Sequence, residues 1–86
     1  MVSKTFEIKT KLFKRRFTTV IQHKLRVLMK CYTVRDFSLD PDNQTFVFKK
    51  SHKINGLVMK DPKEYSGTFT SKESDNPGKT ILILFV

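Results

Sequence analysis

The sequence predicts an α+β protein in which one amphipathic helix packs on a four- to five-stranded, mainly antiparallel sheet, in the order β-α-β-β-β-β. Three observations support this prediction. One segment, residues 14–31, has a helical period, the flanking segments alternate or are apolar, and two turn signals separate the later segments. The 86 residues suffice for a single small domain, 1–86, with one modest core.

The first expected element is a strand over residues 5–13. Its apolar and polar positions alternate with a period of two, which is typical of a half-buried strand. The apolar positions are Phe6, Ile8 and Leu12, and the polar ones are Glu7, Lys9 and Lys11. This strand would therefore present a basic outer face.

The second expected element is a helix over residues 14–31, because apolar residues recur there every three or four positions. They are Phe17, Val20, Ile21, Leu25, Leu28, Met29 and Tyr32. The start is open: Thr19-x-x-Gln22 has the form of a capping box, whereas the apolar period favours a start near Lys14. Cys31 falls near the core side, where we expect a buried thiol and no nucleophile.

Strands are expected over residues 32–39, 45–50, 57–60 and 80–86, and residues 64–70 could extend the sheet. The first two are joined by a turn at 40–43, and Asn55-Gly56 is typical of a type I′ hairpin turn. The polar segment 71–79 is expected to be a mobile loop.

The final strand is apolar at every position from Ile81 to Val86, so both of its faces should be at least partly covered. Two explanations stay open. The strand is central and shielded by neighbouring side chains, or its open face forms a homodimer or partner interface.

The positive charge is concentrated in the first third of the chain. Lys and Arg number 17 against 8 Asp and Glu, for a net charge of +9. Residues 1–31 contain nine of the cations and one acid, Glu7. Such asymmetry is expected of a surface that faces an acidic partner. Compositional bias towards lysine is the alternative, but it should spread evenly along the chain.

The helical segment carries its basic residues on the side opposite the apolar one, with no acid among them. Like charges at helical spacing destabilise a helix slightly, which favours a functional reason for the pattern. Lys14-Arg15-Arg16 falls at or just before the expected helix start, where cations and free N–H groups together can bind phosphate. Lys24 falls within the apolar arc, and we expect its side chain to extend past the sheet edge to solvent.

These patterns predict a small nucleic-acid-binding protein that holds its ligand mainly through phosphate contacts. RNA is favoured over DNA, because no base-reading pattern appears on the basic helix face. The hairpin around Asn55-Gly56 could add a second basic wall. The predicted binding residues are Lys9, Lys11, Lys14, Arg15, Arg16, His23, Arg26, Lys30, Lys49, Lys50 and Lys53. Tyr32, Tyr65 and Phe13 are the candidates for stacking on bases.

An accessory inhibitor or adaptor is the alternative function. Its partner would be an acidic or RNA-loaded protein such as a toxin or nuclease. In composition the chain resembles the small, lysine-rich accessory proteins of large AT-rich phages, many of which block a host enzyme or defence toxin. A small endoribonuclease using His23 and His52 is a minor alternative. Nothing in the spacing brings these histidines together, so we expect no enzyme.

Several classes of protein are not expected. The lone cysteine and the absence of zinc-ligand spacing argue against a disulfide or a metal site. No cofactor-binding motif is present. No signal peptide or membrane-spanning run is found, and binding at a membrane surface is disfavoured because the core needs the apolar helix face. The sequence therefore predicts a cytoplasmic, cofactor-free protein.

Overall fold

The computed structural model describes residues 2–58 and 61–86, and it confirms the α+β class. A short helix pair packs on an antiparallel sheet of five strands, and β4 pairs with β3 alone. The elements are β1 (Ser3–Lys9), α1 (Thr10–Arg15), α2 (Phe17–Leu28), β2 (Tyr32–Asp40), β3 (Thr45–Ile54), β4 (Leu57–Val58), β5 (Lys63–Glu73) and β6 (Lys79–Phe85).

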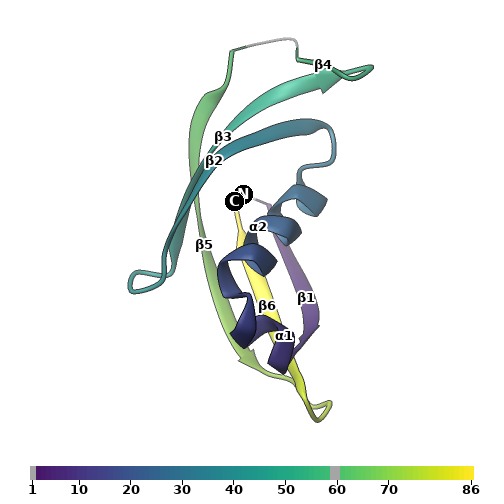
Figure 1. Cartoon of the computed structure of the whole chain (residues 1–86), viewed down its shortest axis with the longest axis vertical. Coiled ribbons are helices and arrows are strands. Elements are labelled where there is room, and N and C mark those ends of the chain that lie inside the picture. The colour runs from purple at the N-terminus through teal and green to yellow at the C-terminus, as the bar shows by residue number, and fades with distance from the viewer. Residues whose placement is uncertain (1, 59–60) are drawn as a thin grey trace.

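The helix pair connects the two edges of the sheet. The strand order is β1-β6-β5-β3-β2, so the chain leaves β1 at one edge and enters β2 at the other. Figure 1 shows the helices crossing in front of β6 and β1, while β2 and β3 curve past the end of α2. The opposite sheet face has no helix of the described residues against it.

The core lies between the helix pair and the covered sheet face. Leu82 and Leu84 of β6 are fully buried there, and Phe17 of α2 meets Phe69 of β5 at a ring-centroid distance of 5.5 Å. The buried apolar residues are Ile8, Phe13, Val20, Ile21, Leu25, Met29, Val34, Phe46, Phe48, Phe69, Leu82 and Leu84. They come from both helices and from every strand of the five-stranded sheet, so one core unites the chain.

The position of β6 accounts for its continuous apolar sequence. The strand pairs with β1 on one side and with β5 on the other. Ile81, Ile83 and Phe85 point to the uncovered face, where they are half-buried beside threonines such as Thr5 and Thr70. This is the arrangement expected of a central strand shielded by its neighbours. A homodimer across this face stays a prediction.

The expected strand over residues 5–13 is wrong beyond Lys9, because α1 begins at Thr10. The Thr10 N–H donates to the Gly78 carbonyl at 2.9 Å, and the hydroxyls of Thr10 and Thr80 are hydrogen-bonded at 2.7 Å. The short helix α1 that begins there buries the Phe13 side chain in the core. Lys11 is therefore a helical residue and does not extend the basic face of a strand.

The expected single helix over residues 14–31 is two helices. The backbone breaks at Arg16, with φ −131° and ψ 47°, and α2 ends at Leu28. Thr19 consequently lies inside α2, and the capping box does not form. Residues 29–31 form a turn, closed by the Tyr32 N–H donating to the Met29 carbonyl at 3.1 Å. The helical period therefore does not extend to Cys31, which is exposed, contrary to the prediction.

Both predicted hairpins form. β2 and β3 pair through the turn after Asp40, and Asn55 and Gly56 take the positive φ values of a type I′ turn, 51° and 82°. The return strand is described at Leu57–Val58, and the rest of its predicted range lies outside the described residues.

The polar loop before the last strand is shorter than the predicted 71–79. β5 continues to Glu73 and β6 begins at Lys79, so the loop comprises residues 74–78. Its mobility stays a prediction.

Candidate nucleic-acid interface

The two helices and the turn after them, residues 10–30, form what we call the helix layer, which is basic and free of acids. It contains seven Lys and Arg residues together with His23. All of these are exposed except Lys24, which is half-buried. In the described part of the chain, the one ion pair joins Lys49 to Asp36 at 3.7 Å, so no cation of the helix layer is neutralised by an acid there.

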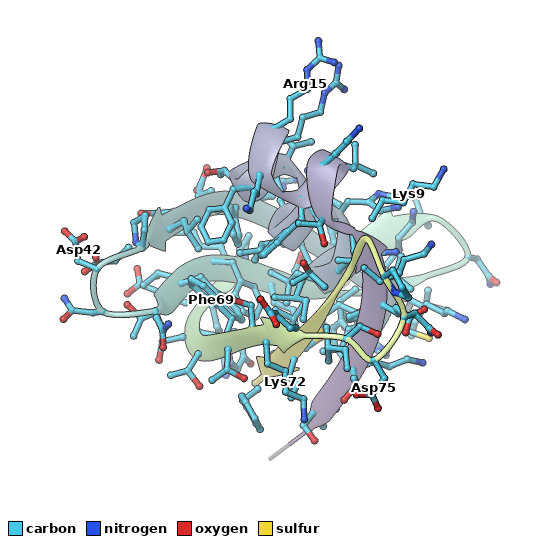
Figure 2. The ribbon with its side chains drawn as sticks, turned by 90° about the horizontal axis from the view of Figure 1, so that it is seen from below. Lys9, Arg15, Asp42, Phe69, Lys72 and Asp75 are labelled. Carbon is cyan, nitrogen blue, oxygen red and sulfur yellow. The ribbon has the colours of Figure 1, made fainter. Side chains whose placement is uncertain are left out.

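Several of the basic residues lie at helix ends. Figure 2 shows Arg15 projecting from the helix side, with Lys72 on the opposite side of the molecule. Lys14 and Arg15 occupy the last turn of α1, and Arg26 the last turn of α2. The macrodipole favours cations at a helix C-terminus. The segment ends α1 and also directly precedes α2, whose N-cap is Arg16, so it lies just before a helix start as predicted, and phosphate binding there stays a prediction.

A basic groove of about 520 Å³ runs between the β1 edge and α2. Its apolar lining comes from Ile8, Leu12 and Val20, and its basic lining comes from Lys9, Arg16, His23, Lys24 and Lys79. The Lys24 ammonium lies 5.2 Å from the Phe6 ring centroid, as expected of a side chain that covers apolar surface with its stem.

The one acid in the groove, Glu7, is engaged by hydrogen bonds. Its carboxylate accepts from the Ser74 hydroxyl at 2.9 Å and from the Asn76 amide at 3.0 and 3.1 Å. It is thereby directed to the loop after β5. The basic side chains of the groove outnumber this one acid.

A second feature, the tyrosine slot, is formed by Tyr32 of β2, Lys50 of β3 and Tyr65 of β5. The Lys50 ammonium lies 4.3 Å from the centroid of each tyrosine ring. These side chains line a cavity of about 260 Å³. Its other lining residues are Ser51, His52, Asp61 and Lys63.

The tyrosine slot lies on the sheet face that the helices cover elsewhere. Tyr65 pairs with the core residue Phe48, and Tyr32 pairs with His52. Because α2 ends at Leu28, this end of the face is open, and both tyrosines are 38% exposed. Two of the three predicted stacking candidates thus meet at one site. The prediction for the third candidate, Phe13, is wrong, because its side chain is buried in the core.

The structure does not bring all predicted binding residues together. Lys9, Arg16 and His23 share the groove, while Lys50 lies in the tyrosine slot. Lys49 points to the uncovered sheet face, where it pairs with Arg35. Lys53 has the same strand parity as Lys49 and pairs with Val58. Of the three lysines predicted to form a basic wall at the Asn55-Gly56 hairpin, only Lys50 lies on the helix side of the sheet.

The two histidines line separate cavities, His23 in the groove and His52 in the tyrosine slot. Within residues 2–58 and 61–86, no group of three or more His, Cys, Asp or Glu side chains is placed to hold a metal ion.

The predicted binding set lacks three lysines of these two features, Lys24 and Lys79 of the groove and Lys63 of the tyrosine slot. Lys63 lies two residues before Tyr65, and this spacing on a strand puts both on one face. That signal was available in the sequence. Lys79 joins the groove only because β6 pairs with β1, so its role depends on the strand order.

No protein-family model matches this chain, and no curated protein or solved structure shows significant similarity to it. Among the described residues, neither helix has the length and apolar character needed to cross a bilayer.

Proposed function

We propose that this chain is a small nucleic-acid-binding protein that prefers RNA to DNA and holds its ligand mainly by phosphate contacts from the helix layer. The observation that carries the proposal is the run of exposed cations over residues 10–30 without a single acid. Surface helices ordinarily mix charges, since pairs of opposite sign at helical spacing stabilise them. A polyanion would supply the missing negative charge.

The placement of these cations suits a strand of phosphates. Arg15 and Arg16 lie at the junction of the helices, and Arg26 and Lys30 lie at the other end of α2. A 12-residue helix is about 18 Å long, which corresponds to several consecutive phosphates of an extended strand. The groove beside α2 adds Lys9 and Lys79 along the same flank.

Two observations favour RNA: α2 has no exposed Asn or Gln, and the tyrosine slot has two exposed aromatic rings. The exposed face of α2 offers His23 and Arg26 but no Asn, and its one Gln, Gln22, is half-buried. Bidentate reading of adenine in a DNA major groove relies on such side chains. Exposed tyrosines are typical of proteins that bind unpaired bases.

The test is binding of a fluorescein-labelled single-stranded RNA, followed by anisotropy as the salt concentration is raised from 50 to 200 mM. With about five phosphate contacts, log K should fall against log salt with a slope of roughly −3.5. A DNA strand of the same sequence should bind more weakly. Absence of binding at 50 mM salt, or a slope near zero, would contradict the proposal.

The second candidate, an inhibitor or adaptor that binds a protein, is favoured by the uncovered sheet face. There Ile81, Ile83 and Phe85 form a half-buried apolar row on β6. Affinity capture with and without nuclease separates the two candidates. Partners that stay bound after nuclease treatment favour a direct protein contact, and partners that are lost favour bridging by RNA.

A further inference from the structure

The tyrosine slot places two exposed aromatic rings around one ammonium group. The two rings contact Lys50 Nζ at equal distances of 4.3 Å, well within the range of a cation–π contact. Their centroids can therefore be no farther apart than twice that distance. Both rings are therefore within reach of one group, and a planar base that takes the place of the ammonium can contact both.

The charges around the slot favour an anionic ligand. Lys50 and Lys63 pair directly across β3 and β5, and His52 lies beside Tyr32 at a ring-centroid distance of 5.4 Å. Asp61 is the one acid among the lining residues that the structure describes. Like-charged neighbours such as Lys50 and Lys63 are unfavourable directly across a sheet, unless an anion lies between them.

The slot also adjoins the helix layer. Lys30 precedes Tyr32 by two residues, and Arg26 lies in the last turn of α2. A strand whose phosphates follow α2 would therefore arrive at the two tyrosines.

We propose that Tyr32 and Tyr65 stack an unpaired base of a single-stranded nucleic acid, while the Lys50 ammonium moves from between the rings to the adjoining phosphate. This inference rests on the proposed function and gives it a preference for single strands. A base in a duplex is already stacked and cannot enter the slot. In the free protein the Lys50 ammonium contacts both rings, and a base that enters takes its place.

The chain provides its own reporter for this step. It contains two tyrosines and no tryptophan, so tyrosine emission comes from Tyr32 and Tyr65 alone. Unlabelled single-stranded RNA should quench this emission, with a midpoint equal to that of the anisotropy titration. An RNA duplex of the same length should bind through phosphate contacts without the quenching.

Three variants complete the test. Tyr32→Leu and Tyr65→Leu should each weaken single-strand binding about tenfold, because one stacked ring is lost, while the salt slope stays the same. Tyr65→Phe keeps the ring and its packing on Phe48, so its affinity should match that of the unchanged protein. Circular dichroism shows whether the leucine variants remain folded.

The outcomes separate the two proposals. Anisotropy that shows single-strand binding without tyrosine quenching would overturn the stacking inference and leave the proposed function standing. Anisotropy that shows no binding to single strands or duplex would remove both. The quenching measurement needs no substitution, so the inference can be tested even if a leucine variant fails to fold.

Discussion

Gly67 on β5 lies directly opposite Phe46 on β3, with no space for a side chain between them. A Cβ on Gly67 would lie 2.5 Å from the Phe46 ring and 2.5 Å from the Phe85 carbonyl oxygen. The Phe46 ring is buried and stacks on Phe37, so it cannot easily move away.

We therefore expect Gly67→Ala to lower the free energy of unfolding by about 1–3 kcal/mol, the usual cost of overpacking a core. Urea unfolding measures it. Ser66→Ala is the matched control, because Ser66 is exposed and its side chain points to the other sheet face, so it should change little. Equal stability of the two variants would contradict this prediction, because it would show that the sheet can shift to make room for a Cβ at Gly67.

The loop before β6 is fastened to β1 by one carboxylate. Asn76 and Ser74 donate three hydrogen bonds to Glu7. All three bonds are exposed, so Asn76→Ala should cost at most about 1 kcal/mol of stability. Its clearer effect should be faster amide exchange, measured by NMR, at residues 76 and 79, whose N–H groups are hydrogen-bonded within the loop. The equivalent change at Asp75, which makes no side-chain hydrogen bond in the described residues, should leave exchange unaltered.

Asp40 stabilises the β2–β3 turn in its charged form. The Asn43 side-chain amide donates to its carboxylate at 2.7 Å, and the Asn43 and Asp42 N–H groups add longer bonds. The Asn43 side-chain bond is the largest cause that lowers the pKa of Asp40 below its ordinary value of 3.8. Because the folded pKa is the lower one, this stabilisation is present above pH 3.8 and is lost as the pH falls through the folded value.

We thus expect Asp40→Asn to lower the melting temperature at neutral pH and to have a smaller effect as the pH falls below the folded pKa. Asp42→Asn removes the same charge from the same turn without removing a hydrogen-bonded carboxylate. A constant difference between the two variants across the acid range would argue against this role of the Asp40 charge.

Cys31 should be the one reactive thiol of the folded protein. It is exposed in the turn after α2, and the chain contains no second cysteine. We expect one equivalent of a thiol reagent to react at the same rate in native buffer and in urea. Labelling that is much slower in native buffer would mean that the turn buries the thiol, as the helical period predicted.

The fold could be predicted from the sequence where local signals were strong and consistent. The helical period over Phe17–Leu28 and the Asn55-Gly56 turn are of this kind. The predicted strand over residues 5–13 was wrong from Thr10 onwards, where α1 begins, and the cause is definite. Leu12 lies four residues after Ile8, which fits the period of a strand and of a helix equally well. The choice depends on the contact between Thr10 and Thr80, which are 70 residues apart.

The sequence predicted which residues could bind a nucleic acid, but it did not predict how they are arranged in space. The acid-free basic segment is visible in the sequence, and so are the two tyrosines. Their meeting at Lys50 depends on β2 and β5 flanking β3, which no local pattern reveals. Lys49 shows the same limit, because only the strand register decides that it faces away from the helices.

The central claim is that the helix layer, and not the net charge as a whole, binds the phosphates. Arg15, Arg26 and Lys30 belong to the helix layer, whereas Arg35, Lys49 and Lys72 lie on the uncovered sheet face. Changing either set of three to Gln removes the same charge. Circular dichroism should show both triple variants folded, because all six side chains are exposed.

The decisive measurement is the salt dependence of single-stranded RNA binding by the two triple variants. The helix-layer variant should bind much more weakly, and its slope should shrink by about two units, since each lost phosphate contact removes about 0.7. The sheet-face variant should keep the slope of the unchanged protein. Equal losses in the two variants would contradict the account, because they would show that binding follows the total charge.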